Sequence, residues 1–80
     1  MRKNFFLKSL LIIGVGSIGK RHLINNLRFF KNIDIVDTRN DRILECKKKF
    51  KIRHAYKSFK TAFSLHNYDA VFITTPPHLH

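Results

Sequence analysis

Three glycines near the start of the sequence have a spacing that suits the binding of a phosphate group. The pattern Gly-x-Gly-x-x-Gly comprises Gly14, Gly16 and Gly19, with Ser17 and Ile18 inside it. At this spacing the first glycine permits a tight turn, the second lets the main chain approach a pyrophosphate, and the third lets a helix pack closely on a strand. The free N–H groups and the dipole of a helix that begins here would hold the phosphate charge.

An acidic residue follows at the distance expected for a contact with a ribose. Asp37 lies 18 residues after Gly19, close to the roughly 20 residues that separate these features in dinucleotide-binding proteins. Its carboxylate can accept hydrogen bonds from both ribose hydroxyls and would repel a 2′-phosphate, which favours NAD as the cofactor. Arg39, two positions further on, can instead pair with a 2′-phosphate, so NADP stays open. We include Thr38, between these two residues, in the predicted cofactor site.

A strand–turn–helix unit must position these residues, and the surrounding sequence predicts one. A continuous apolar run at 10–13 ends at the first glycine, as expected for a strand buried on both faces of a parallel sheet. Further strands are predicted at 33–36, 52–56 and 70–73, and helices from the glycine motif to about 30, at 40–50 and from 58 to about 66. This alternation predicts an α/β fold, a partial Rossmann fold of order β-α-β-α-β-α-β with a parallel sheet of about four strands and flanking helices.

The same periodicity predicts helix faces and helix caps. The first helix is expected to turn its apolar side toward the core, with Ile18, Leu23, Leu27 and Phe30. Thr38 or Asn40 is expected to cap the second helix, and Ser58 the third. Cys46 falls on the apolar side of the second helix, where we expect a buried and unreactive thiol.

The composition limits the chain to one small domain and raises one alternative function. A length of 80 residues permits a single domain, and no stretch approaches the roughly 20 apolar residues of a membrane span. The excess of 16 Lys and Arg over 5 acidic residues makes a basic nucleic-acid-binding domain an alternative. The cations are spread along the chain and form no known binding module, which argues against nucleic acid as a partner. The single cysteine favours a cytoplasmic protein without an internal disulfide.

The segment after the last predicted strand adds a more specific resemblance. Next to the end of the first strand, where open α/β sheets bind ligands, the chain reads Thr74-Thr75-Pro76-Pro77-His78-Leu79-His80. Together with the glycine motif, His22 and Asp37, this segment resembles the amino-terminal domains of the Gfo/Idh/MocA family, the group of glucose–fructose oxidoreductase and inositol dehydrogenase. The resemblance extends over about residues 9–80. It implies that the nicotinamide side of the cofactor cleft is lined by Thr74, Thr75, Pro76 and His80.

The resemblance also implies an activity and points to what this sequence does not contain. Members of the family are similar NAD(P)-dependent oxidoreductases, which implies a sugar, a cyclitol or a related polyol as the substrate. They resemble one another in a Glu-Lys-Pro element after a fifth strand and in a second domain that completes the substrate site, and neither occurs here. We therefore expect residues 1–80 to be the N-terminal part of an NAD(P)-binding Rossmann domain, without the C-terminal substrate domain and inactive alone. No catalytic residue or metal site can be assigned. The expected partners are the dinucleotide and the missing domain or a partner chain, without a membrane.

A further alternative is a nucleotide-sensing regulatory Rossmann module. Such modules also combine glycines with an acid at a strand end, so the cofactor motif alone does not distinguish them. We know of no counterpart there to the Pro-Pro-x-x-His segment at 76–80, which favours the oxidoreductase.

Overall fold

One parallel sheet organises the protein. The computed structural model describes residues 7–74. In chain order its elements are β1 (Leu7–Ile13), α1 (Ser17–Asn26), β2 (Phe30–Val36), α2 (Asn40–Lys49), β3 (His54–Tyr56), α3 (Phe59–Leu65) and β4 (Ala70–Ile73). The strands of this described part run parallel in the order β3-β2-β1-β4. The predicted partial Rossmann fold, with strands and helices in alternation, is confirmed.

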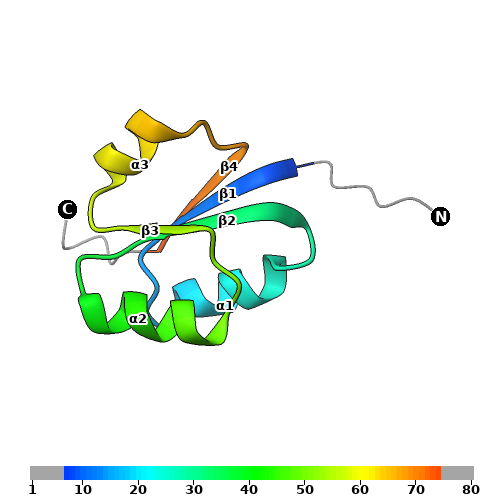
Figure 1. Ribbon diagram of the computed structural model, residues 1–80. Helices are drawn as coiled ribbons and strands as arrows, with labels where there is room; N and C mark the ends of the chain where they lie inside the picture. Colours follow the sequence, from blue (N-terminus) through cyan, green and yellow to red (C-terminus); the bar gives the residue numbers. More distant parts are fainter. Residues whose placement is uncertain (1–6, 75–80) are drawn as a thin grey trace.

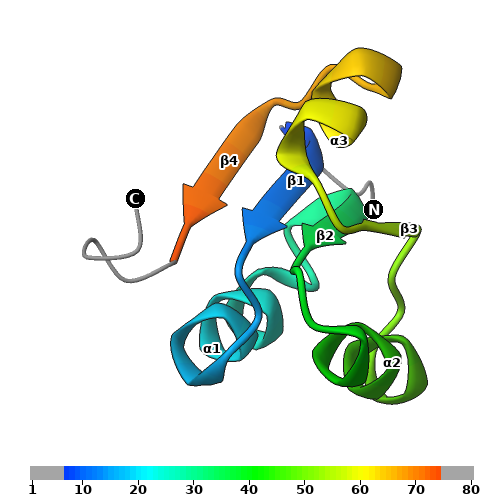
Figure 2. The same ribbon diagram turned by 90° about the vertical axis from the view of Figure 1, so that its left-hand side faces the viewer.

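Helices cover both faces of the sheet. Figure 1 shows α1 and α2 next to each other on one face and α3 on the other, and Figure 2 shows the same layers after a quarter turn. The main core lies on the face of α1 and α2 and includes Leu10 and Ile12 of β1. A smaller cluster joins Leu11 of β1 to Ala62 of α3. Because neighbouring strand residues point to opposite faces, β1 is buried on both, as its continuous apolar run predicted.

The first helix ends earlier than predicted. α1 ends at Asn26, the chain turns through 27–29, and Phe30 begins β2 as a buried strand residue. The prediction of a helix to about Phe30 is therefore wrong. The side-chain amide of Asn26 donates a hydrogen bond to the carbonyl oxygen of His22 (2.8 Å). Asparagine side chains that bind local main-chain groups in this way disfavour the continuation of a helix.

The apolar side of α1 is confirmed only in the second half of the helix. Leu23 is buried, and Leu27 packs against the main core. Ile18 is instead 62% exposed, so the prediction that it faces the core is wrong. Ile18 lies in the first turn and lines a pocket at the carboxyl ends of the strands. At this end of the helix, an apolar residue at a helical spacing faces the pocket and is not buried against the sheet.

The N-termini of α2 and α3 are satisfied in different ways. The Ser58 hydroxyl accepts a hydrogen bond from a main-chain N–H of the first turn of α3 (3.1 Å), which confirms the predicted cap. The N-cap residue of α2 is Arg39, which provides no side-chain cap. The prediction that Thr38 or Asn40 caps α2 is therefore wrong. The carboxylate of Asp37 accepts a hydrogen bond from the Arg39 N–H instead (2.9 Å).

A buried carboxylate holds the edge strand β3 against β2. Asp34 is fully buried in the middle of β2. Arg53 donates two hydrogen bonds to it, from Nε to Oδ1 (3.0 Å) and from Nη2 to Oδ2 (2.9 Å). The His54 N–H donates to Oδ1 (3.1 Å), and the Tyr68 hydroxyl donates to Oδ2 (2.5 Å). This cluster could not be predicted from the sequence, because its members are far apart in the chain.

Candidate functional site

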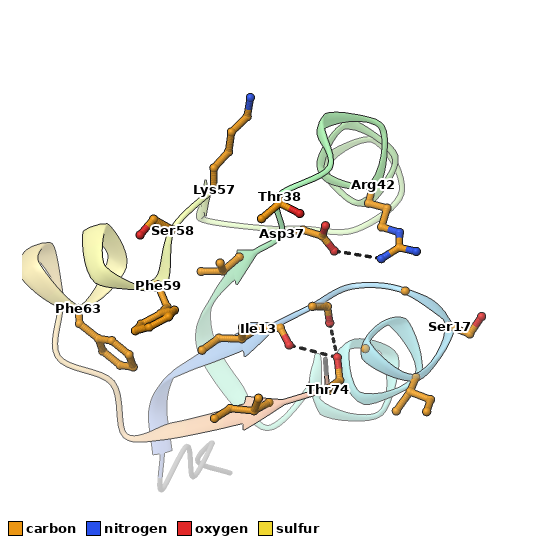
Figure 3. Close-up of a pocket in the computed structure, with 16 residues that line it drawn as sticks. Ile13, Ser17, Asp37, Thr38, Arg42, Lys57, Ser58, Phe59, Phe63 and Thr74 are labelled. Carbon is orange, nitrogen blue, oxygen red and sulfur yellow. Dashed lines mark hydrogen bonds and ion pairs between the residues drawn. The ribbon is translucent and has the colours of Figure 1, made fainter. Parts of the chain in front are cut away.

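A pocket of about 960 Å³ opens at the carboxyl ends of the strands. Figure 3 shows side chains that surround it from the ends of β1, β2 and β4 and from the connection between β3 and α3. Most of the residues that the sequence analysis singled out lie in its wall, namely Gly14, Gly16, Ser17, Ile18, Gly19, Asp37, Thr38 and Thr74. The fold thus brings together three segments that are far apart in the chain, the glycine motif, the end of β2 and the end of β4.

Two of the three glycines are required by the fold itself. Gly14 has a φ of 92°, in the left-handed region that residues with a side chain disfavour. A Cβ on Gly19 would lie 1.9 Å from the carbonyl oxygen of Gly14, too close for any side chain. These positions match the tight turn and the close helix–strand packing expected from the motif.

Gly16 differs, because the protein has room for a side chain there. Its backbone is extended, with φ −73° and ψ −157°, and lies outside the left-handed region that favours glycine. The three heavy atoms nearest to a Cβ built on Gly16 all belong to the Arg42 guanidinium, at 3.5 to 3.7 Å, which is normal contact distance. A glycine that the fold does not require is expected where a ligand must approach the main chain.

The N-terminus of α1 adds a positive end to the wall of the pocket. Its N-cap residue, Gly16, has no side chain to accept hydrogen bonds from the first turn, and the first turn contains no acidic residue. The N–H groups at the start of a helix, here including those of Ser17 and Ile18, have no partner within the helix. Together with the helix dipole, they make this end of α1 suited to an anion.

Asp37 connects the end of β2 to the glycine turn. Its side chain is only 5% exposed. Oδ2 accepts a hydrogen bond from the Val15 N–H (2.9 Å), and Oδ1 accepts one from the Arg39 N–H (2.9 Å). Each carboxylate oxygen can accept a further hydrogen bond. The carboxylate is therefore fixed in place by the main chain and retains capacity for a ligand.

The two arginines near Asp37 have different positions, and the sequence analysis chose the one further from the pocket. The Arg39 guanidinium is bound to Asp41 by hydrogen bonds from Nε (3.1 Å) and Nη2 (2.7 Å) at the surface. Arg42 lines the pocket and lies 3.6 Å from Oδ2 of Asp37, measured from Nη1. α2 begins at Asn40, so Arg42 lies in its first turn, and no motif in the sequence favours Arg42 over Arg39.

Thr74 secures the end of β4 to the glycine turn. Its hydroxyl hydrogen-bonds to the carbonyl oxygens of Gly14 (2.6 Å) and Ile13 (3.1 Å), as Figure 3 shows. The other three residues that the resemblance added, Thr75, Pro76 and His80, lie outside the described residues. His22 packs edge-on against Phe72 of β4, with ring centroids 5.1 Å apart, as a helix residue against the sheet.

One side of the pocket is apolar, and the sequence analysis did not assign it to the site. Phe59 and Phe63 of α3 line it together with Ile13 and Ile73. Phe59 and Phe63 are 48% and 46% exposed. Their exposed ring faces offer a surface on which a flat ring can pack.

The described residues offer few groups for redox or metal chemistry of their own. Residues 7–74 contain no cluster of three His, Cys, Asp or Glu side chains placed to hold a metal ion. Cys46 is buried as predicted, and burial raises the pKa of its thiol, so the reactive thiolate is disfavoured. Within these residues, no helix has both the length and the apolar character that a membrane crossing requires.

The fold and the pocket together define a class of protein. A parallel sheet of order β3-β2-β1-β4, a glycine-rich turn into α1 and a carboxylate at the end of β2 are the features of a dinucleotide-binding Rossmann domain. Over residues 8–80 the sequence matches the oxidoreductase family with an NAD-binding Rossmann fold, Gfo/Idh/MocA. The chain belongs to this family and is an NAD-binding Rossmann domain of it. Membership favours dinucleotide binding over a basic nucleic-acid binder or a regulatory nucleotide sensor.

Solved structures with the same fold come from scyllo-inositol dehydrogenase of Lactobacillus casei. The structure with bound NAD(H) and scyllo-inositol has a TM-score of 0.79 and 24% sequence identity, over 91% of this chain and 22% of that one. The apo structure has a TM-score of 0.80, with the same identity and coverage. This chain thus spans about a fifth of the length of the enzyme that it matches. No curated protein sequence matches it.

Proposed function

We propose that the pocket binds NAD across the carboxyl ends of the strands, with the pyrophosphate over Gly16. The first-turn N–H groups of α1, including those of Ser17 and Ile18, would face the pyrophosphate oxygens. The carboxylate of Asp37 would accept hydrogen bonds from the hydroxyls of the adenosine ribose. NAD supplies the hydride-accepting ring, whereas this chain supplies binding and orientation.

The remaining predicted residues have smaller parts in this proposal. Thr38, after β2, and Thr74, after β4, line the pocket on either side of the end of β1. Thr75, Pro76 and His80 are assigned to the nicotinamide side only by the family resemblance. Arg39 is a candidate for contact with a 2′-phosphate if NADP replaces NAD. No residue of the chain is assigned a catalytic role, and no metal is assigned.

The main support for the proposal is Gly16, a glycine that the fold does not require. Gly14 and Gly19 have structural reasons to lack a side chain, and Gly16 has none within residues 7–74. A Cβ at Gly16 would project into the space where the pyrophosphate must lie. The residues present thus fit a dinucleotide, because they leave a bare main chain at Gly16 in the wall of a pocket large enough for such a ligand.

A comparison of two alanine variants tests this proposal. Gly16→Ala should remain folded, with a loss of about 1 kcal/mol in the free energy of unfolding, because Gly is preferred to Ala at a helix N-cap by about that amount. The same variant should lose NADH binding, measured as the change in NADH fluorescence and as the shift in melting temperature with NAD. Gly19→Ala should unfold the protein. Unchanged NADH affinity in a folded Gly16→Ala variant would contradict the proposal.

We further propose that the domain is the N-terminal part of an oxidoreductase that acts on a sugar, a cyclitol or a related polyol. The family resemblance supports it, as does the scyllo-inositol bound to the structural neighbour. β4 is an outer strand of the sheet and its Val71 is 37% exposed, which supports a further polypeptide segment or partner chain beside β4. The single buried cysteine favours a cytoplasmic location.

A chimera tests the proposed activity. Residues 1–80 would replace the matching N-terminal part of the Lactobacillus casei scyllo-inositol dehydrogenase. We expect reduction of NAD on addition of scyllo-inositol, and the Gly16→Ala chimera should lose it. A chimera that folds and binds NADH but oxidises no cyclitol or sugar would refute the proposed substrate class and leave cofactor binding intact.

A further inference from the structure

The guanidinium of Arg42 lies between the two features that define the cofactor site. Nη1 is 3.6 Å from Oδ2 of Asp37, and 3.5 Å from the position that a Cβ on Gly16 would occupy. Figure 3 shows Arg42 directed from α2 toward Asp37. An adenosine ribose that hydrogen-bonds to Asp37, with its pyrophosphate over Gly16, must lie beside this guanidinium.

The donors of Arg42 are available to a ligand. The distance of 3.6 Å between Arg42 Nη1 and Asp37 Oδ2 is short enough for an ion pair but longer than a good hydrogen bond. Within residues 7–74 the guanidinium has no hydrogen-bond acceptor, although it can donate five N–H groups in a planar fork that matches a phosphate. The side chain is 38% exposed, so it can reorient at little cost.

The Asp37–Arg42 pair also changes the cofactor preference that is usually inferred from an acidic residue at the end of β2. A lone carboxylate at this position repels a 2′-phosphate and selects NAD. Here two main-chain N–H groups and the guanidinium surround the carboxylate and offset its charge. The barrier to a 2′-phosphate is therefore smaller than the sequence alone indicates.

Two other cations near the site are less well placed. The Arg39 guanidinium is already held by Asp41 through two hydrogen bonds at the surface. Lys57 lines the pocket, but its side chain extends away from Asp37 (Figure 3). Arg42 is the cation that faces both Asp37 and the glycine turn.

We infer that Arg42 broadens the cofactor specificity of the site, because its guanidinium lies beside the 2′ position of the adenosine ribose and admits the 2′-phosphate of NADP as well as the 2′-hydroxyl of NAD. The inference rests on the proposed function, since it assumes that the pocket holds a dinucleotide in this orientation. With NADP the guanidinium pairs with the phosphate, and with NAD it remains on Asp37, whose free lone pairs accept the ribose hydroxyls.

The test measures the dissociation constants of NADH and NADPH for the full chain by fluorescence titration. Arg42→Gln should weaken the binding of NADPH by tenfold or more, the size expected for the loss of a charge-assisted hydrogen bond to phosphate. It should weaken the binding of NADH by less than about threefold. Arg42→Lys, which keeps the charge without the fork, should recover part of the NADPH affinity. Arg39→Gln and Lys57→Gln test the rival cations, and Arg28→Gln on the exposed turn after α1 is the charge-matched control.

The outcomes separate the inference from the proposed function. A wild-type chain that binds neither nucleotide overturns both. A chain that binds NADH, but in which Arg42→Gln leaves the ratio of the two dissociation constants unchanged, overturns the inference alone. The inference also fails if Arg39→Gln or Lys57→Gln produces the selective NADPH loss instead.

Discussion

Asp34 and Asp37 are two buried carboxylates, one within β2 and the other directly after it, and they have opposite surroundings. The relative exposure is 0% for Asp34 and 6% for Asp37. Side chains from other segments surround Asp34, whereas mainly main-chain N–H groups and an open pocket surround Asp37. Burial alone therefore does not distinguish a carboxylate that holds a fold together from one that is available to a ligand.

The surroundings of Asp34 use its hydrogen-bonding capacity within the protein. Burial acts to raise its pKa, but the hydrogen bonds from Arg53 and Tyr68, with the charge of Arg53, outweigh this and lower the pKa below its usual value. Oδ1 and Oδ2 each accept two hydrogen bonds. Asp37 accepts one on each oxygen, with Arg42 as an additional ion pair, so a ligand can still bind there.

The largest effect on stability is expected for Asp34→Ala. This change leaves the Arg53 guanidinium, whose side chain is 29% exposed, without its counter-charge, and the Tyr68 hydroxyl without its acceptor. We expect a loss of about 3 kcal/mol in the free energy of unfolding, measured by urea denaturation, at the lower end for a broken buried pair because Arg53 retains contact with water. Asp41→Ala, at an exposed carboxylate, is the control and should change it little. A loss in Asp34→Ala as small as that expected for Asp41→Ala would mean that the Asp34 cluster does not stabilise the fold.

The same carboxylate predicts a pH dependence of stability. Because the pKa of Asp34 is lowered in the folded state, its contribution is complete above the unfolded pKa of about 4 and is lost as the pH falls from there toward the folded pKa. The urea concentration at the midpoint of unfolding, measured at decreasing pH, should therefore fall more steeply below about pH 4 in the wild type than in Asp34→Asn. Parallel curves would show that other groups cause the acid sensitivity.

In contrast to Asp34→Ala, Asp37→Asn is expected to affect the binding of NADH more than the stability of the fold. The amide keeps one acceptor for the main chain but loses the charge, so stability should fall by about 1 to 2 kcal/mol, the difference between charged and neutral hydrogen bonds. NADH affinity should fall about tenfold or more, because the amide cannot accept two ribose hydroxyls as a carboxylate does. If NADH binding is retained while stability falls as far as in Asp34→Ala, the contrast between the two carboxylates is wrong.

The sequence was sufficient for the features that depend on neighbours along the chain. The apolar run of β1, the glycine turn and the alternation of strands and helices are local patterns with local physical causes, and they placed Gly14, Gly16, Gly19 and Asp37 together correctly. The Ser58 cap was predictable for the same reason. In contrast, the end of α1 depends on the Asn26 side chain, which hydrogen-bonds to the main chain. The spacing of apolar residues gives no information about such a side-chain hydrogen bond.

Contacts between distant segments were not predictable from one sequence. Asp34 lies in an apolar strand pattern, and its partners Arg53 and Tyr68 follow 19 and 34 residues later without a motif that connects them. Arg42 and Arg39 have the same chemistry and lie near the same acid, so only the direction of the first turn of α2 distinguishes them. The nicotinamide side depended on family resemblance, and its last residues lie outside 7–74.

The smallest effect is expected for Tyr68→Phe, which removes a single donor from the Asp34 cluster and keeps the ring. The lost hydrogen bond, 2.5 Å long, should reduce the free energy of unfolding by about 1 kcal/mol, because Arg53 still satisfies Oδ2. Burial, followed by the hydrogen bond to Asp34, raises the pKa of Tyr68 in the folded state. Its contribution is thus complete below the unfolded pKa of about 10 and declines as the pH rises above it, a decline that the phenylalanine variant should lack. NADH affinity should not change, since Tyr68 does not line the pocket; an altered affinity would show that the two carboxylates are coupled through the sheet.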